Sequence, residues 1–164
     1  TCESGQVNRY LNKVSGPLLD RIDLHITVGS IEFNDMTKDT LEEDSSIIRE
    51  RVINARAIQA ERYKGKSGIY TNAQMTTQQL RKYCKIDRTK TVEVENTMKS
   101  NHLSARAYDR ILKVSRTIAD LAGSEQINFD HFAEAVRYRC LDKEGWGKTH
   151  KSVKLEGKAI EGNN

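Results

Sequence analysis

Apolar residues recur with helical spacing in the second half of the chain. Successive intervals of four, four, three, four and three residues separate Leu103, Ala107, Ile111, Val114, Ile118 and Leu121. This spacing is typical of an amphipathic helix, which Ser104 can cap at its start and Gly123 can end. A last helix is predicted after the cap residue Asn128, with an inward face formed by Phe129, Phe132, Ala133, Val136 and Cys140.

Three further helices are predicted upstream. The longest runs from about residue 39 to 63, and its apolar side is predicted to contain Ile48, Val52, Ala55 and Ile58. The glycines in the segment 64–68 favour its end, because glycine readily adopts the left-handed conformation of a helix stop. A shorter helix is expected after Thr76 or Thr77, carrying Leu80 and Tyr83, and another after Asp87. Together these patterns predict a bundle of four or five helices.

The first thirty residues follow a different pattern. Ile22, Leu24, Ile26 and Val28 alternate with polar or small residues, a period of two that predicts a strand. A turn at 15–17 precedes it, and a short helix is predicted at 6–14. One strand cannot satisfy its own backbone hydrogen bonds, so its partner is expected to come from another part of a longer protein or from a second copy.

Composition agrees with a helical fold. The chain has 164 residues, enough for one ordinary domain, with 37% hydrophobic, 6% aromatic and 30% charged residues. This lean composition favours a solvated helical protein over a β-sandwich or barrel. The net charge of +4 is mildly basic. No apolar run approaches the roughly 20 residues that span a bilayer, so no membrane association is expected. Because residue 1 is Thr, the chain is expected to be a piece of a longer protein.

The cysteines and histidines predict neither a disulfide framework nor a metal site. Cys2, Cys84 and Cys140 are odd in number and far apart, which favours a reducing, cytoplasmic compartment. Cys84 and Cys140 are expected to be small buried apolar residues. The four histidines have no metal-binding spacing. His25, on the polar side of the predicted strand, is expected to be a surface or hydrogen-bonded residue.

Arg21 is the first candidate functional residue. It stands at the entrance of the predicted strand, after a rigid turn, between Asp20 and Asp23. A guanidinium group offers a planar set of donors that suits phosphate or carboxylate. The local pattern leaves two interpretations open: Arg21 is held out for an anion, or it forms a salt bridge with a neighbouring aspartate.

Arg106 is the second candidate. With Ser104 as the cap, Arg106 lies in the first helical turn, where a cation faces the positive end of the helix dipole at a cost of about 0.3–1 kcal/mol. A phosphate shared between this arginine and the free N–H groups would explain the placement, and an ion pair with Asp109 three residues on is the alternative. The same helix carries a basic stripe formed by Arg106, Arg110, Lys113 and Arg116. This stripe is either a solvated face or a possible DNA-binding surface.

Three strings make a family resemblance specific: SGPLLDRIDLHI at 15–26, NHLSARAYDRILKVSRTIADLAG at 101–123 and HFAEAVRYRCLD at 131–142. Over about residues 5–147 the chain resembles the C-terminal part of Mg-chelatase-like AAA+ ATPases, in their ComM/YifB competence-protein branch. The resemblance implies that Arg21 is an arginine finger that acts on the nucleotide site of a neighbouring subunit. It also implies that Arg106 is the sensor 2 arginine of the helical lid, acting on its own or a neighbour's site. The residues around Cys2 resemble the end of a cysteine-containing insertion whose other cysteines are not in this chain.

The resemblance also implies an organisation. Residues 1–31 would be the edge of an AAA+ core, 32–46 an acidic linker, 47–147 the helical lid and 148–164 a flexible tail. The fold would be mainly α, with one short strand and helix left from the α/β core. The full-length protein is expected to use ATP and Mg²⁺, to form a ring, with a hexamer expected, and to act on DNA. This chain alone is expected to bind no cofactor, since it lacks the GxxxxGK[ST] phosphate loop. The alternatives are a motor for Mg²⁺ insertion into a porphyrin and a helical nucleic-acid-binding module without an ATP role.

Overall fold

The fold is mainly helical. The computed structural model describes residues 13, 16–19, 21–26, 28–30 and 43–139. In these residues the α-helices are α2 (Gly16–Leu19), α4 (Ser45–Arg62), α5 (Thr77–Tyr83), α6 (Thr91–Ser100), α7 (Ala105–Leu121) and α8 (Phe129–Arg137), with 3-10 turns η1 (Asn72–Gln74) and η2 (Arg88–Lys90). The predicted mainly helical fold is confirmed. The helix predicted at 6–14, most of the linker, the tail, Cys2 and Cys140 lie outside the described residues.

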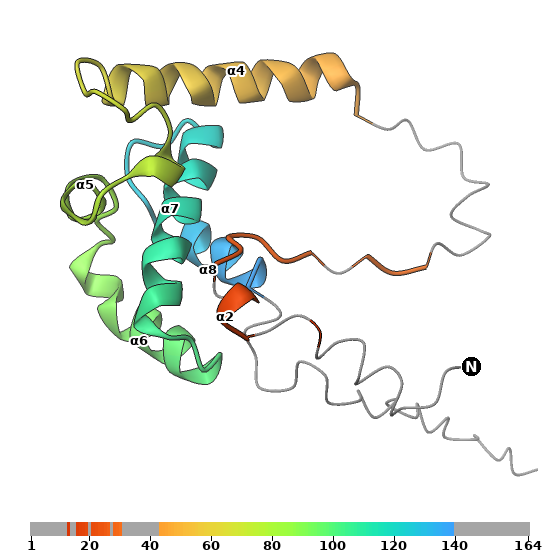
Figure 1. The fold of residues 1–164 in the computed structure, drawn as a ribbon, viewed down its shortest axis with the longest axis vertical. Helices are drawn as coiled ribbons and strands as arrows, with labels where there is room; N and C mark the ends of the chain where they lie inside the picture. Colours follow the sequence, from red (N-terminus) through yellow and green to blue (C-terminus); the bar gives the residue numbers. More distant parts are fainter. Residues whose placement is uncertain (1–12, 14–15, 20, 27, 31–42, 140–164) are drawn as a thin grey trace, which may run out of the picture.

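Helix α7 is the centre of the bundle (Figure 1). It contacts α4, α5, α8 and η1, while α6 packs on α8. Helix α4 crosses the C-terminal end of α7, and its own N-terminal half extends away from the bundle (Figure 1). The bundle therefore forms around one long amphipathic helix, the one whose apolar spacing is most regular in the sequence.

The predicted helix boundaries follow local capping chemistry. Ser104 Oγ accepts a hydrogen bond from the Ala107 N–H at 3.1 Å, and Gly123 has a φ of 64° after the last turn of α7. Asn128 caps α8 in a reciprocal capping box with His131. Helix α4 begins at Ser45 rather than near residue 39, because the Asp44 carboxylate accepts from the Ser46 N–H at 2.7 Å. Each cap satisfies backbone donors that a helix end leaves open.

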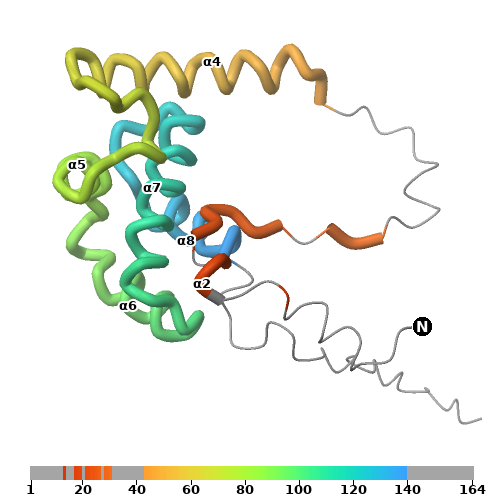
Figure 2. The backbone as a smooth tube through the Cα atoms, in the orientation of Figure 1, coloured from red at the N-terminus to blue at the C-terminus, as the bar shows by residue number. Residues whose placement is uncertain are grey.

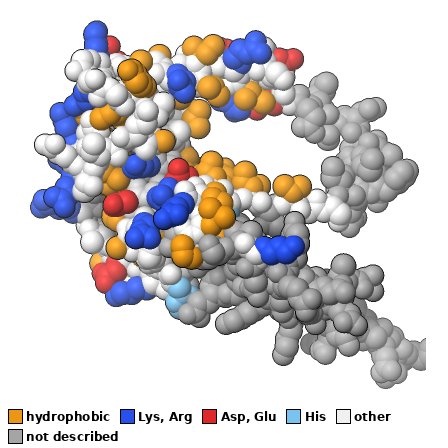
Figure 3. Space-filling model, viewed as in Figure 1, with side chains coloured by type: hydrophobic (Ala, Val, Ile, Leu, Met, Phe, Trp, Pro, Cys, Tyr) orange, Lys and Arg blue, Asp and Glu red, His pale blue; other side chains and the backbone are white. Residues whose placement is uncertain are grey.

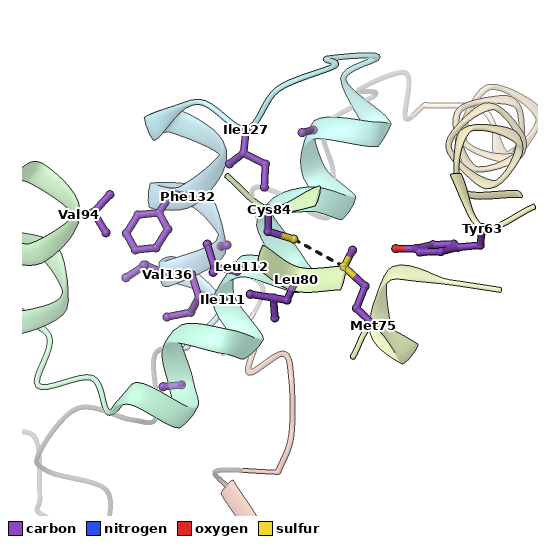
Figure 4. Close-up of a cluster of buried hydrophobic side chains, with 13 residues drawn as sticks. Tyr63, Met75, Leu80, Cys84, Val94, Ile111, Leu112, Ile127, Phe132 and Val136 are labelled. Atoms are coloured by element: carbon purple, nitrogen blue, oxygen red, sulfur yellow. Dashed lines mark hydrogen bonds between the residues drawn. The ribbon is translucent and has the colours of Figure 1, made fainter. Parts of the chain in front are cut away.

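The core lies where α5, α6 and α8 meet α7. Figure 4 shows Phe132 of α8 close to Ile111 and Leu112 of α7 within one buried cluster. At the other side of the core, the rings of Tyr63 and Tyr83 pack edge to face with their centroids 6.0 Å apart, a favourable aromatic geometry. Burial raises the pKa of Tyr63 to about 12, so its hydroxyl stays protonated and donates to Asn72 Oδ1 at 2.8 Å.

Cys84 is a core residue, as predicted. It is 5% exposed, and its Sγ lies 3.7 Å from Met75 Sδ (Figure 4). Burial raises the pKa of the Cys84 thiol to about 11. At pH 8 only about one thiol in a thousand is then a reactive thiolate.

We therefore expect Cys84 to resist alkylation in the folded protein. Treatment with iodoacetamide at pH 8, followed by peptide mass mapping, should leave Cys84 unmodified over a time that fully labels it in urea. Mapping by peptide separates Cys84 from Cys2 and Cys140. Equal labelling rates with and without urea would contradict the buried placement.

One predicted inward face is only partly buried. Of the four apolar residues predicted to face inward from α4, Ala55 is buried, whereas Ile48, Val52 and Ile58 are exposed. Ile48 and Val52 lie in the N-terminal half of α4, which extends away from the bundle, whereas α7 lies under the C-terminal half (Figure 1). In that C-terminal half the buried side is formed by Ala55 and Gln59, and Ile58 lies beside it. This part of the prediction is wrong within the described residues.

The predicted strand at 22–29 is also wrong within the described residues. Only an isolated parallel bridge joins His25 to Arg139, with the His25 N–H donating to the Tyr138 carbonyl at 2.6 Å. His25 is hydrogen-bonded, one of its two predicted states, but it is also buried. The alternating apolar residues are exposed instead, namely Ile22, Leu24, Ile26 and Val28. Apolar side chains are thus exposed along this segment and along α4 (Figure 3).

Candidate functional site

Arg21 lies exposed on a turn that a buried residue anchors. Helix α2 ends at Leu19, which is buried, and the Arg21 N–H donates to the Leu18 carbonyl at 3.0 Å. Among the described residues Arg21 makes no ion pair, and Asp23 pairs with Arg110 instead. Asp20 lies outside them. The local salt bridge with Asp23 is therefore not formed, and the guanidinium group is accessible.

Arg106 lies in the first turn of α7, as predicted, and is exposed. It lines a hollow of about 320 Å³ together with Ala73, Met75, Thr77, Leu80, Asp109, Arg110 and Lys113. Three cations and one carboxylate border this hollow, so its wall is positive. Arg106, Arg110 and Lys113 are neighbours because residues three and four apart share one side of a helix.

The structure gives the other basic residues of α7 different surroundings. Arg110 pairs with Asp23, and Lys113 Nζ donates to the Ala73 carbonyl at 2.8 Å. Arg116 is only 2% exposed, and its guanidinium donates to the carbonyls of Glu125 and Ser124 at 2.8 and 2.5 Å. The predicted placement of Arg116 on an exposed basic stripe is wrong. Arg116 lies ten residues after Arg106, which turns its side chain about 80° away around the helix axis, and the loop after α7 encloses it.

Arg116 belongs to a buried polar cluster that the sequence did not reveal. Its centre is Asp120, which is 2% exposed and accepts from Arg116 Nε at 3.0 Å and from Asn72 Nδ2 at 2.7 Å. Arg62 of α4 also donates to both Asp120 oxygens, at 2.6 and 2.5 Å. Burial disfavours the charge on Arg62, yet the hydrogen bonds and charge of Asp120 leave its pKa raised. We call Arg62, Asn72, Arg116 and Asp120 the Asp120 cluster; it joins α4, η1 and α7.

The segment that follows Arg21 is attached to the end of α8 (Figure 2). Besides the His25 contact with Tyr138, the Arg139 guanidinium donates to the Ile22 carbonyl. The imidazole Nε2 of His25 lies 3.3 Å from the Leu19 carbonyl oxygen, and His25 and Arg139 are both buried. We call Leu19, Ile22, His25, Tyr138 and Arg139 the α8 joint. Through it, the turn with Arg21 is held on the same body as α7.

The described residues contain no group of three or more His, Cys, Asp or Glu side chains arranged to hold a metal ion. Among the same residues, no helix has the length and apolar character needed to cross a membrane.

Comparisons with known proteins give consistent matches. The family model described as magnesium chelatase, subunit ChlI C-terminal, matches residues 42–139, and the model described as magnesium chelatase, subunit ChlI, matches residues 1–36. The chain is 44% identical over 141 residues to the competence protein ComM of Haemophilus influenzae, covering 83% of this chain and 26% of that protein. It is 36% identical over 143 residues to the uncharacterized protein YifB of Escherichia coli, covering 87% of this chain and 27% of that protein. An uncharacterized protein of Mycobacterium tuberculosis is 33% identical over 138 residues, covering 84% of this chain and 27% of that protein. The chain thus spans about a quarter of the length of these relatives.

Proposed function

Because this chain belongs to the magnesium chelatase ChlI family, we propose that it is the part of a ring-forming ATPase that supplies two arginines to nucleotide sites. Arg21 is the arginine finger and Arg106 is the sensor 2 arginine of the lid. The observation that carries this proposal is that both guanidinium groups are exposed on one body, one on an anchored turn and one at the start of the central helix.

The hollow beside Arg106 suits a phosphate group. Its charged wall consists of Arg106, Arg110, Lys113 and Asp109, so cations exceed carboxylates by three to one. The first N–H groups of α7 add positive potential at the same end of the helix. Such a donor set suits phosphate oxygens and not a divalent cation, which prefers carboxylate and carbonyl ligands. ATP is therefore the cofactor these residues fit, and they would contact its phosphates rather than its Mg²⁺.

The two arginines would perform different tasks. ATP, when bound, supplies the γ-phosphoryl group that is transferred to water, a reaction that depends on positioning and on stabilising charge. Arg21 projects from its subunit and donates hydrogen bonds to the charge that develops in the site of the neighbour. Arg106 donates from the lid and holds the lid against the nucleotide. Turnover therefore requires a ring, because one subunit completes the site of the next.

We expect Arg106→Ala in the whole protein to weaken nucleotide binding. A charge-assisted hydrogen bond contributes about 1.5–3 kcal/mol, so the KM for ATP should rise by about tenfold or more. Steady-state ATPase assays measure this, with Arg81→Ala as the control, since Arg81 is an exposed arginine on α5 outside the hollow. Equal KM values for the two variants would contradict the sensor role.

DNA is the proposed substrate of the motor. One relative carries the name competence protein, and the resemblance of the three sequence strings implies a role in DNA processing. The lid helix itself gives less support, because Arg116 is buried and Arg110 is ion-paired. We therefore place DNA contact on the assembled ring. Turnover stimulated by single- or double-stranded DNA would support this proposal, whereas turnover indifferent to DNA would favour the Mg²⁺-insertion motor.

A further inference from the structure

We propose that Asp23 and Arg110 are a positioning pair that makes the Arg21 turn move together with α7. The inference rests on the proposed function for the roles of Arg21 and Arg106. It adds that these two arginines are mechanically coupled within one subunit, through an ion pair whose carboxylate, Asp23, lies outside the hollow.

Each residue of the pair lies close in sequence to one of the two functional arginines. Asp23 follows Arg21 by two residues, and Arg110 follows Arg106 by four residues, which is about one helical turn. The Arg110 guanidinium donates to Asp23 Oδ1 across 87 residues of chain. A rigid helical turn, one ion pair and a short backbone segment therefore connect Arg106 to Arg21.

This contact differs from the other exposed ion pairs of the described residues. Those pairs join residues close in sequence: Glu43 with Arg51, Glu61 with Lys64, Lys90 with Glu93, and Glu95 with Lys99. Each of these pairs lies within one helix or at one of its ends. Asp23 and Arg110 instead join the segment before α4 to the central helix, so their contact fixes the relative position of two parts of the fold.

The α8 joint holds the backbone on both sides of Asp23. Leu19, His25 and Arg139 are buried, and the joint holds the backbone at Ile22 and His25. Asp23 lies between these two anchored residues, so the joint holds its backbone beside the end of α8. The contact of its carboxylate with Arg110 adds an attachment to α7, two residues from Arg21.

The pair is suited to positioning rather than to stability. Its side chains are 47% exposed for Asp23 and 28% exposed for Arg110. Exposed ion pairs contribute little to folding, about 0–1 kcal/mol. A displacement of about 1 Å at a reacting group, in contrast, can reduce a rate by about 10²-fold. Loss of the pair should therefore change turnover much more than it changes the melting temperature.

The test uses the whole protein and four variants at the pair. Asp23→Asn removes the charge and should lower kcat about tenfold, with the KM for ATP and the melting temperature unchanged. Asp23→Glu keeps the charge and should retain most of the turnover. Arg110→Gln should lower kcat similarly and also raise KM, because Arg110 lines the hollow. The double variant Asp23→Asn with Arg110→Gln should have the kcat of Arg110→Gln alone, since the contact is already lost.

A matched control and a second readout separate this inference from the proposed function. Glu95→Gln removes the carboxylate of an exposed ion pair on α6 and should leave kcat unchanged. Hydrogen exchange at the His25 amide, which needs no ATP, should be about two- to fivefold faster in Asp23→Asn than in Glu95→Gln. If Arg21→Ala stops turnover while Asp23→Asn matches Glu95→Gln in kcat, the positioning role is wrong and the proposed function stands. Unchanged exchange at His25 in Asp23→Asn would overturn the coupling of the pair to the joint. If Arg21→Ala leaves turnover intact, both the finger and its positioning are wrong.

Discussion

Arg21→Ala in the whole protein is expected to lower the kcat for ATP hydrolysis by about 10³-fold or more, the effect typical of losing an arginine finger. The physical reason is that charge spreads over the phosphoryl oxygens in the transition state, and a positioned guanidinium stabilises it without reorganisation. Arg21 is exposed and makes no ion pair among the described residues, so alanine removes no contact that the subunit itself needs. Steady-state ATPase assays at saturating ATP measure the loss.

The specificity of this effect is checked on the same protein. ATP binding, measured by calorimetry, should remain within a few-fold of wild type, because a finger acts mainly in the transition state. The melting temperature should also be unchanged. A variant with normal turnover would contradict the finger assignment, and a variant that no longer folds would show that Arg21 is structural.

Asp120→Ala should have the largest effect on stability. The substitution removes the carboxylate that contacts both the buried Arg116 and the part-buried Arg62, whose side chain is 12% exposed. Breaking a buried ion pair by removing one partner costs about 3–5 kcal/mol, a large part of the 5–15 kcal/mol that stabilises an ordinary domain. Urea unfolding followed by helical circular dichroism should show an earlier transition or an unfolded chain.

The control for this substitution lies on the same helix. Asp109 is an exposed aspartate of α7, and Asp109→Ala should change the free energy of unfolding by no more than about 0.5 kcal/mol. Thr117→Val offers a milder change within reach of the cluster, since Thr117 Oγ1 accepts only from Asn72 Nδ2 there at 3.1 Å. It should destabilise the chain by about 1 kcal/mol. If Asp120→Ala and Asp109→Ala unfold at the same urea concentration, the Asp120 cluster does not hold the helices together.

Local features of this fold could be predicted from the sequence. Ser104 and Asn128 cap the two best helices because an N-cap depends on a few adjacent residues, and Gly123 ends α7 through its own backbone conformation. Cys84 is buried as expected, since small thiols are typical of cores. The placement of the two candidate arginines also depends on neighbouring residues alone. Arg21 is exposed beside a turn and Arg106 lies in a first helical turn, as predicted.

The errors concern contacts between distant segments. Arg116 was assigned to a basic face because helical periodicity places a side chain relative to its own helix and ignores the loop that packs over it. His25 is hydrogen-bonded, as one of its two interpretations predicts, but its place on the polar side of a strand is wrong, because its contact with the end of α8 leaves it buried. The pairing of Asp23 with Arg110 could not be predicted either, because no local spacing relates residues 87 positions apart. Tertiary packing decides all three.

Mixed rings test the central claim, that Arg21 acts on a neighbouring subunit, most directly. Arg21→Ala subunits would be mixed in equal amounts with subunits whose phosphate-binding loop, which this chain does not contain, has been inactivated. Each population alone should be inactive. In mixed rings a loop-inactivated subunit still supplies its Arg21 to an adjacent Arg21→Ala subunit that binds ATP, so turnover should return to about a quarter of the wild-type value for random head-to-tail neighbours. Turnover that stays at the level of the separate variants would contradict the account.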